Sequence, residues 1–345
     1  MKRIFRRGCG HFGMGIVLLS SAVNVLQANP DATTATVSQG SATFNTSGSQ
    51  FTINQTSANA FINWQTFNIA AGETTTFNQP SSSSVTWNYI NDPQNPGASS
   101  INGNINAIGY VVLQNPNGFS VSGQASITAH GLIMTTASTP ALNLSSGGPW
   151  SFNTPPPTKS IVNYGQINIV GGGSAFLIAN DVENNGTISA PGGKIGLYAG
   201  QTVLVSTSPD GRGLSAQATI PQGLVDNNGN LVADAGSIAL QAQMVNQNGL
   251  IQANSAQNVN GTIELVAGDE VNLGAHSVIS AQGDVQGTSS GGSVTIKSDN
   301  SFSDQAGSAI NISGGTQGGN GGQVEISAPR MSAVNSRITG QAVDG

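Results

Sequence analysis

The sequence predicts an all-β protein, specifically a right-handed parallel β-helix. Three observations lead to this fold class. Short β-branched segments recur along the chain, one apolar unit repeats at a nearly constant spacing, and the polar residues are mostly uncharged. Charged residues make up only 8% of the chain, against about 25% in an ordinary globular protein. Neutral polar faces of this kind suit a long, repetitive β-structure.

The β-branched segments are short and lie between Gly, Asn or Pro residues, a pattern typical of strands and turns with almost no helix. Examples are the segments 51–54, 110–113, 167–170, 175–178, 203–205 and 271–273.

Two alternating units indicate a solenoid. The first, Gly-x-Ile-x-Leu with Val or Ile variants, begins at Gly193, Gly236, Gly261, Gly292 and Gly322, at separations of 43, 25, 31 and 30 residues. The second recurs in the segments 185–190, 248–253, 276–281 and 307–312. One coil needs about three strands of ~5 residues plus turns, or roughly 20–30 residues, so each repeat matches one coil. Apolar residues two apart point to the same face, which predicts stacked Ile, Val and Leu columns inside the helix.

The first residues predict a secretory signal peptide over 1–28. Four basic residues are followed by a short apolar stretch and by Ala28, which is the order that a removable signal shows. The apolar part is far shorter than the ~20 residues of a membrane span. The only cysteine, Cys9, lies in this segment, so the mature chain must be held by burial and backbone pairing without disulfides.

The mature chain divides into three parts. Residues 29–91 are rich in Phe and Trp and lack the regular repeat, so we expect them to form an N-terminal cap and the first coils. Residues 92–270 are expected to form the main β-helix, and 271–345 to add further coils, with the repeat still running at Gly345. Prolines near 140–160, and Pro and Gly residues within 206–234, predict two excursions from the helix, the second a hairpin against its side.

Two stretches resemble the secretion domain of two-partner-secretion exoproteins, the family of filamentous haemagglutinin and the high-molecular-weight adhesins. The first is Asn-Trp-Gln-Thr-Phe-Asn-Ile at 63–69, and the second is the apolar strand after Ile101 that leads into Asn-Pro-Asn-Gly at 115–118. The resemblance covers roughly residues 31–270. The chain departs from the common family form at Phe119, where a smaller aliphatic residue is usual, and in its Pro-rich insertion after Pro140.

Asn115-Pro116-Asn117-Gly118 has the composition of a β-turn. Proline presets φ for the first central position, the Asn117 or Gly118 backbone accepts the left-handed conformation, and Asn115 can bond its own backbone. Two interpretations stay open here: the turn only connects two strands, or it is also read by a partner, and the two roles are compatible.

The resemblance implies a function in export. It implies a partner, an outer-membrane transporter of the TpsB type, whose periplasmic domains read a signal that includes Asn115, Pro116, Asn117 and Gly118. We also assign Trp64, Phe67 and Asn68 to this signal. The unfolded segment is expected to add an edge strand to the transporter. The product is then an extracellular or surface-attached adhesin, a monomer that binds a host-cell or matrix receptor or a glycan.

A secreted polysaccharide lyase or hydrolase is the alternative, because such enzymes need clustered carboxylates. Asp181 and Glu183 lie on one strand face and could bind Ca²⁺ with Asp210 or Asp226, although isolated outward acids are more often solvated. The sequence 318–323 resembles a calcium-binding repeat but has Gln323 in place of the ligating Asp, and is interpreted as a turn.

Other classes of function are disfavoured. The mature histidines are His130 and His276 only, which leaves no basis for a zinc site or a catalytic triad. Without the signal, six basic residues face 16 acidic ones, a formal charge of −10, which disfavours nucleic acid. We expect no enzyme activity, no cofactor and no metal. An autotransporter passenger would need a C-terminal membrane barrel, and we see no such pattern of strands in this sequence.

Overall fold

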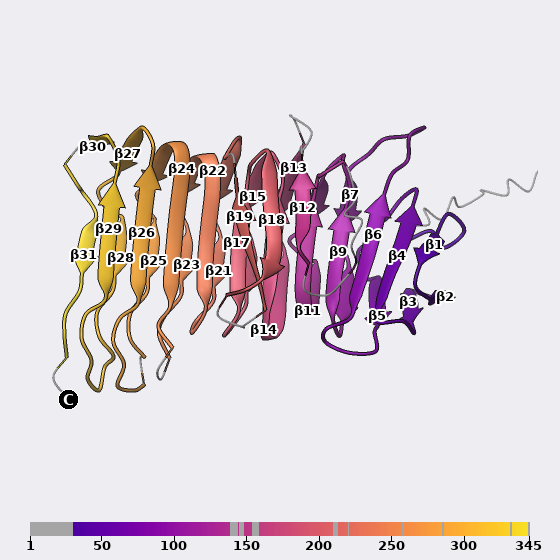
Figure 1. Cartoon of the computed structure of the whole chain (residues 1–345), viewed down its shortest axis with the longest axis horizontal. Coiled ribbons are helices and arrows are strands. Elements are labelled where there is room, and N and C mark those ends of the chain that lie inside the picture. Colours follow the sequence, from indigo (N-terminus) through magenta and orange to yellow (C-terminus); the bar gives the residue numbers. More distant parts are fainter. Residues whose placement is uncertain are drawn as a thin grey trace, which may run out of the picture.

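The computed structural model describes residues 30–138, 144, 148–153, 159–209, 213–219, 221–256, 259–284, 286–331 and 333–343. The signal peptide expected over 1–28 lies outside the described residues. Throughout the described part the chain forms strands and turns, stacked along one long axis (Figure 1). The predicted fold class, an all-β parallel β-helix, is confirmed by this architecture.

Each coil runs through three faces in the order face 3, face 2, face 1, and every face is a ladder of parallel strands. Face 1 contains β4 (Asn59–Trp64), β6 (Val85–Ile90), β9 (Tyr110–Gln114), the second halves of β11 (Ser126–Thr135) and β14 (Gln166–Ile178), β17 (Lys194–Tyr198), the first halves of β22 (Ser237–Gln247) and β24 (Thr262–Leu273), β26 (Ser293–Ser298) and β29 (Gln323–Ser327).

Face 2 contains β3 (Gln50–Gln55), β5 (Thr74–Asn78), β8 (Asn104–Ala107), the first halves of β11 and β14, β16 (Thr187–Ser189), β21 (Asn230–Val232), β23 (Leu250–Gln252), β25 (Val278–Ser280), β28 (Ala309–Asn311) and β31 (Arg337–Thr339). Face 3 contains β7 (Ser99–Ile101), β10 (Phe119–Val121), β13 (Ser160–Asn163), β15 (Asp181–Asn184), β20 (Leu224–Asn227), the second halves of β22 and β24, β27 (Ser301–Asp304) and β30 (Arg330–Met331).

The repeating glycine of the first unit is required by the stacking of the coils. The residues after each glycine are in register from β17 to β29, which confirms the repeat. A Cβ atom on Gly236 would lie 2.0 Å from the backbone oxygen of Gly193 in the coil before. The two apolar residues that follow, such as Ile238 and Leu240, are fully buried in the central core.

Two antiparallel strands cover the N-terminal end of the helix. β1 (Thr36–Gln39) pairs with β4, and β2 (Ala42–Ser47) pairs with β3. Aromatic rings fill the first coils below them, because the ring centroid of Trp64 lies 5.4 Å from those of Phe44 and Phe67. The cap is therefore these two strands, and regular parallel pairing begins at β3 and β4, within the segment 29–91.

A second, smaller sheet lies outside face 1. It consists of β12 (Trp150–Asn153), β18 (Thr202–Thr207) and β19 (Leu214–Ala218), all antiparallel. It buries aromatic side chains that point outward from face 1, including Trp87, whose ring stacks on Phe152 at 5.7 Å. Face 1 is thus covered on both sides over these coils.

The boundary expected for the second excursion, 206–234, is wrong at both ends. The excursion already includes all of β18, while β20 and β21 pair with β15 and β16 as regular strands of the helix. The sequence Asn228-Gly-Asn-Leu-Val-Ala is a further copy of the second repeat unit, interpreted as a turn because of its Asn-Asn-Gly start. In the segment 140–160, the described strand is β12, which pairs with β18.

Candidate functional site

The segment Asn115-Pro-Asn-Gly connects β9 to β10 as a hydrogen-bonded β-turn. The Gly118 N–H donates to the carbonyl of Asn115 at 3.0 Å, and the Asn117 N–H donates to the Asn115 side-chain oxygen at 2.8 Å. Gly118 adopts the left-handed conformation with φ of 99°. A Cβ atom there would also lie 2.5 Å from the Ser160 oxygen of the next coil. Glycine is therefore required by both conformation and space.

The Asn115 side chain is buried and holds a neighbouring loop in place. Its Nδ2 atom donates to the Gly97 carbonyl and to the Ser99 hydroxyl, both at 3.0 Å. Gly97 belongs to the loop 91–98, which connects β6 to β7, and Ser99 is the first residue of β7. Both polar atoms of this buried amide therefore have hydrogen-bond partners. These bonds fix the turn and the loop relative to each other.

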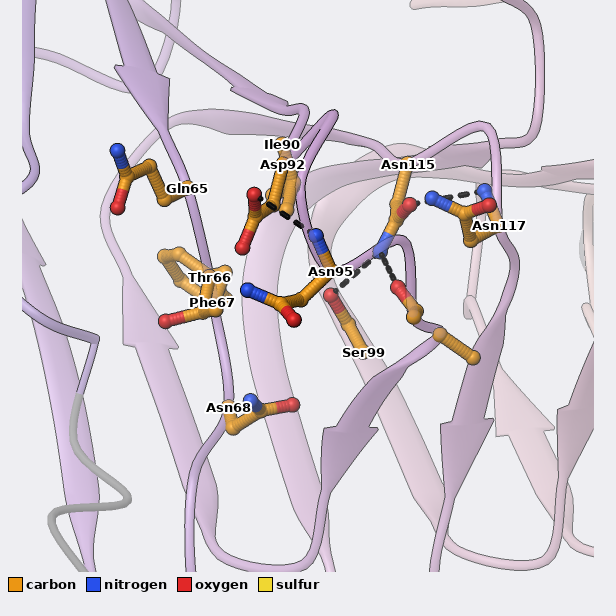
Figure 2. A pocket seen from close by; sticks show the side chains of 12 residues that line it. Gln65, Thr66, Phe67, Asn68, Ile90, Asp92, Asn95, Ser99, Asn115 and Asn117 are labelled. Atoms are coloured by element: carbon orange, nitrogen blue, oxygen red, sulfur yellow. Dashed lines mark hydrogen bonds between the residues drawn. The ribbon is translucent and has the colours of Figure 1, made fainter.

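Between the turn and the loop lies a cavity of about 180 Å³, lined by both polar and apolar side chains (Figure 2). Its lining comprises residues 65–68, Ile90, Asp92, Asn95, 97–99, Asn115 and Asn117. Asp92 organises the loop, because its Oδ1 accepts the backbone N–H groups of Gln94 and Asn95 at 2.9 and 3.1 Å. Amides, hydroxyls and one carboxylate suit hydrogen bonding to a polypeptide backbone or to polar side chains.

The structure brings most of the predicted site residues to this cavity. Asn68 lies on its wall and accepts the Ser100 N–H at 2.8 Å, which ties the segment before β5 to β7. Phe67 also lines the cavity, although its side chain is fully buried. Pro116 is half-buried at the first central position of the turn.

Trp64 does not line the cavity. It is buried in the aromatic core, where its indole N–H donates to the Asn88 side chain at 3.1 Å. Its surroundings indicate a packing role.

The loop 91–98 was missed in the sequence. Asp92-Pro-Gln-Asn-Pro-Gly is a run of turn-forming residues and could have been recognised as a loop. Its proximity to Asn115 could not, because the two segments meet only after a full coil has formed.

Three of the ionisable side chains considered in the sequence, Asp181, Glu183 and Asp226, lie on neighbouring strands of face 3. Glu183 and Asp226 are neighbours on face 3, whereas Asp210 lies outside the described residues. Within the described ranges, no group of three or more His, Cys, Asp or Glu side chains is placed to hold a metal ion. The described residues also contain no helix long and apolar enough to cross a membrane.

The chain is thus a capped parallel β-helix that carries this turn and cavity. The family model of the TPS secretion domain matches residues 26–213, and the chain belongs to that family. It is accordingly an exoprotein of the two-partner-secretion type, exported through the periplasm to the extracellular space or the cell surface.

Two relatives are heme/hemopexin-binding proteins of Haemophilus influenzae, 30% identical over 260 residues and 28% identical over 268 residues. The matches cover 71% and 69% of this chain and 28% of each relative, so the chain spans little more than a quarter of their length. The HMW1 secretion domain of the same species has a similar fold, with a TM-score of 0.66 at 24% identity, covering 89% of this chain and 97% of that one.

Proposed function

We propose that an outer-membrane transporter of the TpsB type exports this chain, and that the transporter's periplasmic domains read the segments that form the turn and the loop 91–98. The observation that supports this most is the use of Asn115. One buried amide fixes the turn and an exposed loop around a cavity, within the residues that the secretion-domain family model covers.

The proposed sequence of events has two stages. In the periplasm the chain is unfolded, and its backbone near these segments adds an edge strand to the transporter. Outside the cell the Ile, Val and Leu columns become buried coil by coil, each side chain contributing about 1.5–3 kcal/mol. Folding outside the cell then disfavours backward movement.

After export, the protein is proposed to act as a surface adhesin that binds a host-cell or matrix receptor or a glycan. The comparisons give no support to a polysaccharide lyase or hydrolase, because the relatives carry the names of binding proteins.

The test is co-expression with a TpsB-type transporter in a host that lacks one, followed by measurement of the protein outside the cell. We expect Asn115→Ala to reduce export at least ten-fold, because the transporter then loses one side chain of the segment that it is proposed to read. Asn95→Ala changes only an exposed side chain of the cavity and is expected to reduce export while folding normally. Asn230→Ala, an exposed asparagine on face 2, is the matched control.

Export that is equal for all four proteins would contradict the proposal. To separate recognition from folding, each variant is also refolded in vitro and compared by circular dichroism. A variant that folds normally but stays in the periplasm identifies a recognition residue.

A further inference from the structure

A strip of amide and carboxylate side chains runs along the outside of face 3 and its corner with face 2, away from the turn. On face 3 the outward positions stack in register from coil to coil, and the next row stands at the corner, two residues further on. We call this set the amide strip: Glu183, Asp226, Asn246, Asn272 and Ser303 on the face, and Asn185, Asn228 and Asn248 at the corner.

Hydrogen bonds hold these side chains in fixed orientations. Asn185 donates to Glu183 at 2.7 Å, and Asn228 donates to Asp226 at 3.3 Å. Further along, Asn272 donates to Asn246 at 3.1 Å. Each amide keeps hydrogen-bonding capacity for a ligand, because an Asn side chain has two donor hydrogens and two acceptor lone pairs.

The strip is hollowed over part of its length. A cavity of about 250 Å³ lies over Asp226, Asn228, Asn248 and their neighbours. The position that follows Asn248 in the corner row is Gly274, where a Cβ atom would lie 2.2 Å from the Asn248 side-chain oxygen. The Asn248 amide therefore lies over Gly274, where its side-chain oxygen accepts the His276 N–H at 3.1 Å.

An exposed aromatic ring stands in the same corner row. Tyr164 follows Asn163 just as Asn185 follows Asn184, and Asn163 and Asn184 are paired in register. The Tyr164 side chain is 52% exposed. A phenol ring of this kind offers an apolar face beside polar groups, which is the combination that stacks against a sugar ring.

The charge of the strip favours a neutral ligand. Its ionisable groups are the two carboxylates of Glu183 and Asp226, on adjacent strands. Desolvation raises the pKa of Asp226, and the negative charge of Glu183 raises it further. Carboxylates accept hydrogen bonds from hydroxyl groups and repel anions, so an acidic polymer is disfavoured here.

We propose that the amide strip binds a neutral, hydroxyl-rich oligosaccharide, laid along the helix axis with one end stacked on Tyr164. Strands are ~4.8 Å apart, close to the length of one sugar unit, so successive sugars meet successive coils. This inference rests on the adhesive part of the proposed function and gives it a ligand class.

The experiment applies the purified full chain to immobilised neutral galactose- and N-acetylglucosamine-containing oligosaccharides, beside sialylated and sulphated versions of equal length. Binding to neutral glycans alone is expected. Affinity for the best probe, measured by calorimetry, should fall about ten-fold in Asn228→Ala and in Tyr164→Ala, because each removes one ligand contact. Asn230→Ala, on the other side of the corner, should bind as the unchanged protein does.

Absence of neutral-glycan binding, preference for acidic glycans, or full affinity in both strip variants would overturn the inference. Because purified protein is used, failure of export in the transporter experiment does not affect the outcome. Circular dichroism checks that each variant is folded.

Discussion

At the scale of single residues, a buried amide ladder fixes the corner between faces 3 and 2. Asn184 accepts from Asn163 at 2.8 Å and donates to Asn227 at 2.8 Å, and Asn227 in turn donates to Gln247 at 2.7 Å. All four side chains are fully buried. The ladder repeats one side-chain contact between each pair of these four successive coils, so it aligns them as well as stabilising them.

We predict that Asn184→Ala destabilises the fold by about 1–3 kcal/mol, because a buried donor on Asn163 and an acceptor on Asn227 lose their partner. Urea unfolding measures this. Asn185 is one residue away and points outward. The free energy of unfolding of Asn185→Ala should therefore stay within about 0.5 kcal/mol of that of the unchanged protein. Equal effects of the two substitutions would show that the ladder contributes little.

We predict that Gly236→Ala lowers the free energy of unfolding by about 1–3 kcal/mol or more, because the added methyl group must push two coils apart. Gly97→Ala is the control, because its Cβ would meet nothing closer than 4.0 Å. Thermal unfolding of both variants gives the comparison, and a normal midpoint for Gly236→Ala would contradict the close approach.

At the scale of elements, the turns that join the faces carry specific polar anchors. Asp304 ends β27 and accepts the backbone N–H groups of Asn335 and Ser336 at 2.9 and 2.6 Å, from the following coil. Burial acts to raise the pKa of Asp304, but hydrogen bonds from Ser336 and Asn335 outweigh it, and the pKa is lowered from 3.8. The charged carboxylate is therefore the form that holds this coil.

This anchor should be sensitive to acid. Its stabilisation is complete above the ordinary pKa of 3.8 and is lost as the pH falls through the lowered value in the folded protein. Hydrogen exchange in residues 333–336 should increase on acidification below pH 3.8, relative to the intrinsic rate, before the central coils respond. In Asp304→Asn the exchange should be fast already at neutral pH, and protection that is unchanged in this variant would be inconsistent with the assignment.

The outer sheet is an element that can be tested separately. Phe152→Ala should destabilise the packing of the outer sheet on face 1 by about 3–5 kcal/mol, because Phe152 is fully buried against Trp87. We expect increased binding of an apolar dye with little change in the β-helix signal in circular dichroism. Leu204→Ala is the control, since Leu204 lies on the exposed side of the same sheet.

At the scale of the whole molecule, the stability is distributed along one dimension, because each coil contacts only its neighbours. Ile296→Ala in β26 should therefore accelerate hydrogen exchange in β24, β26 and β29, which are in register with it. β4 and β6 should exchange as before. A uniform change along the chain would indicate a single cooperative unit instead.

The sequence allowed the coils to be predicted where a steric requirement recurs at each turn, as at Gly193, Gly236 and Gly261. The outer sheet could not be predicted from the sequence. Its pairing of β12 with β18 does not recur along the chain and depends on a surface that exists only in the folded protein. The turn at 115–118 was recognisable from its residues, whereas its contact with the loop 91–98 was not. The coil that contains Leu231 was not predicted from the sequence, because the Asn-Asn-Gly at its corner has the composition of a hairpin turn.

Both excursions leave the helix at the same place, after a strand of face 1 and before one of face 3. Insertions at this corner leave all three ladders in register, as β15 and β20 show by pairing across the longer excursion. The corner is thus a natural grafting point, at which relatives can diversify, or a foreign epitope can be displayed, without redesign of the scaffold.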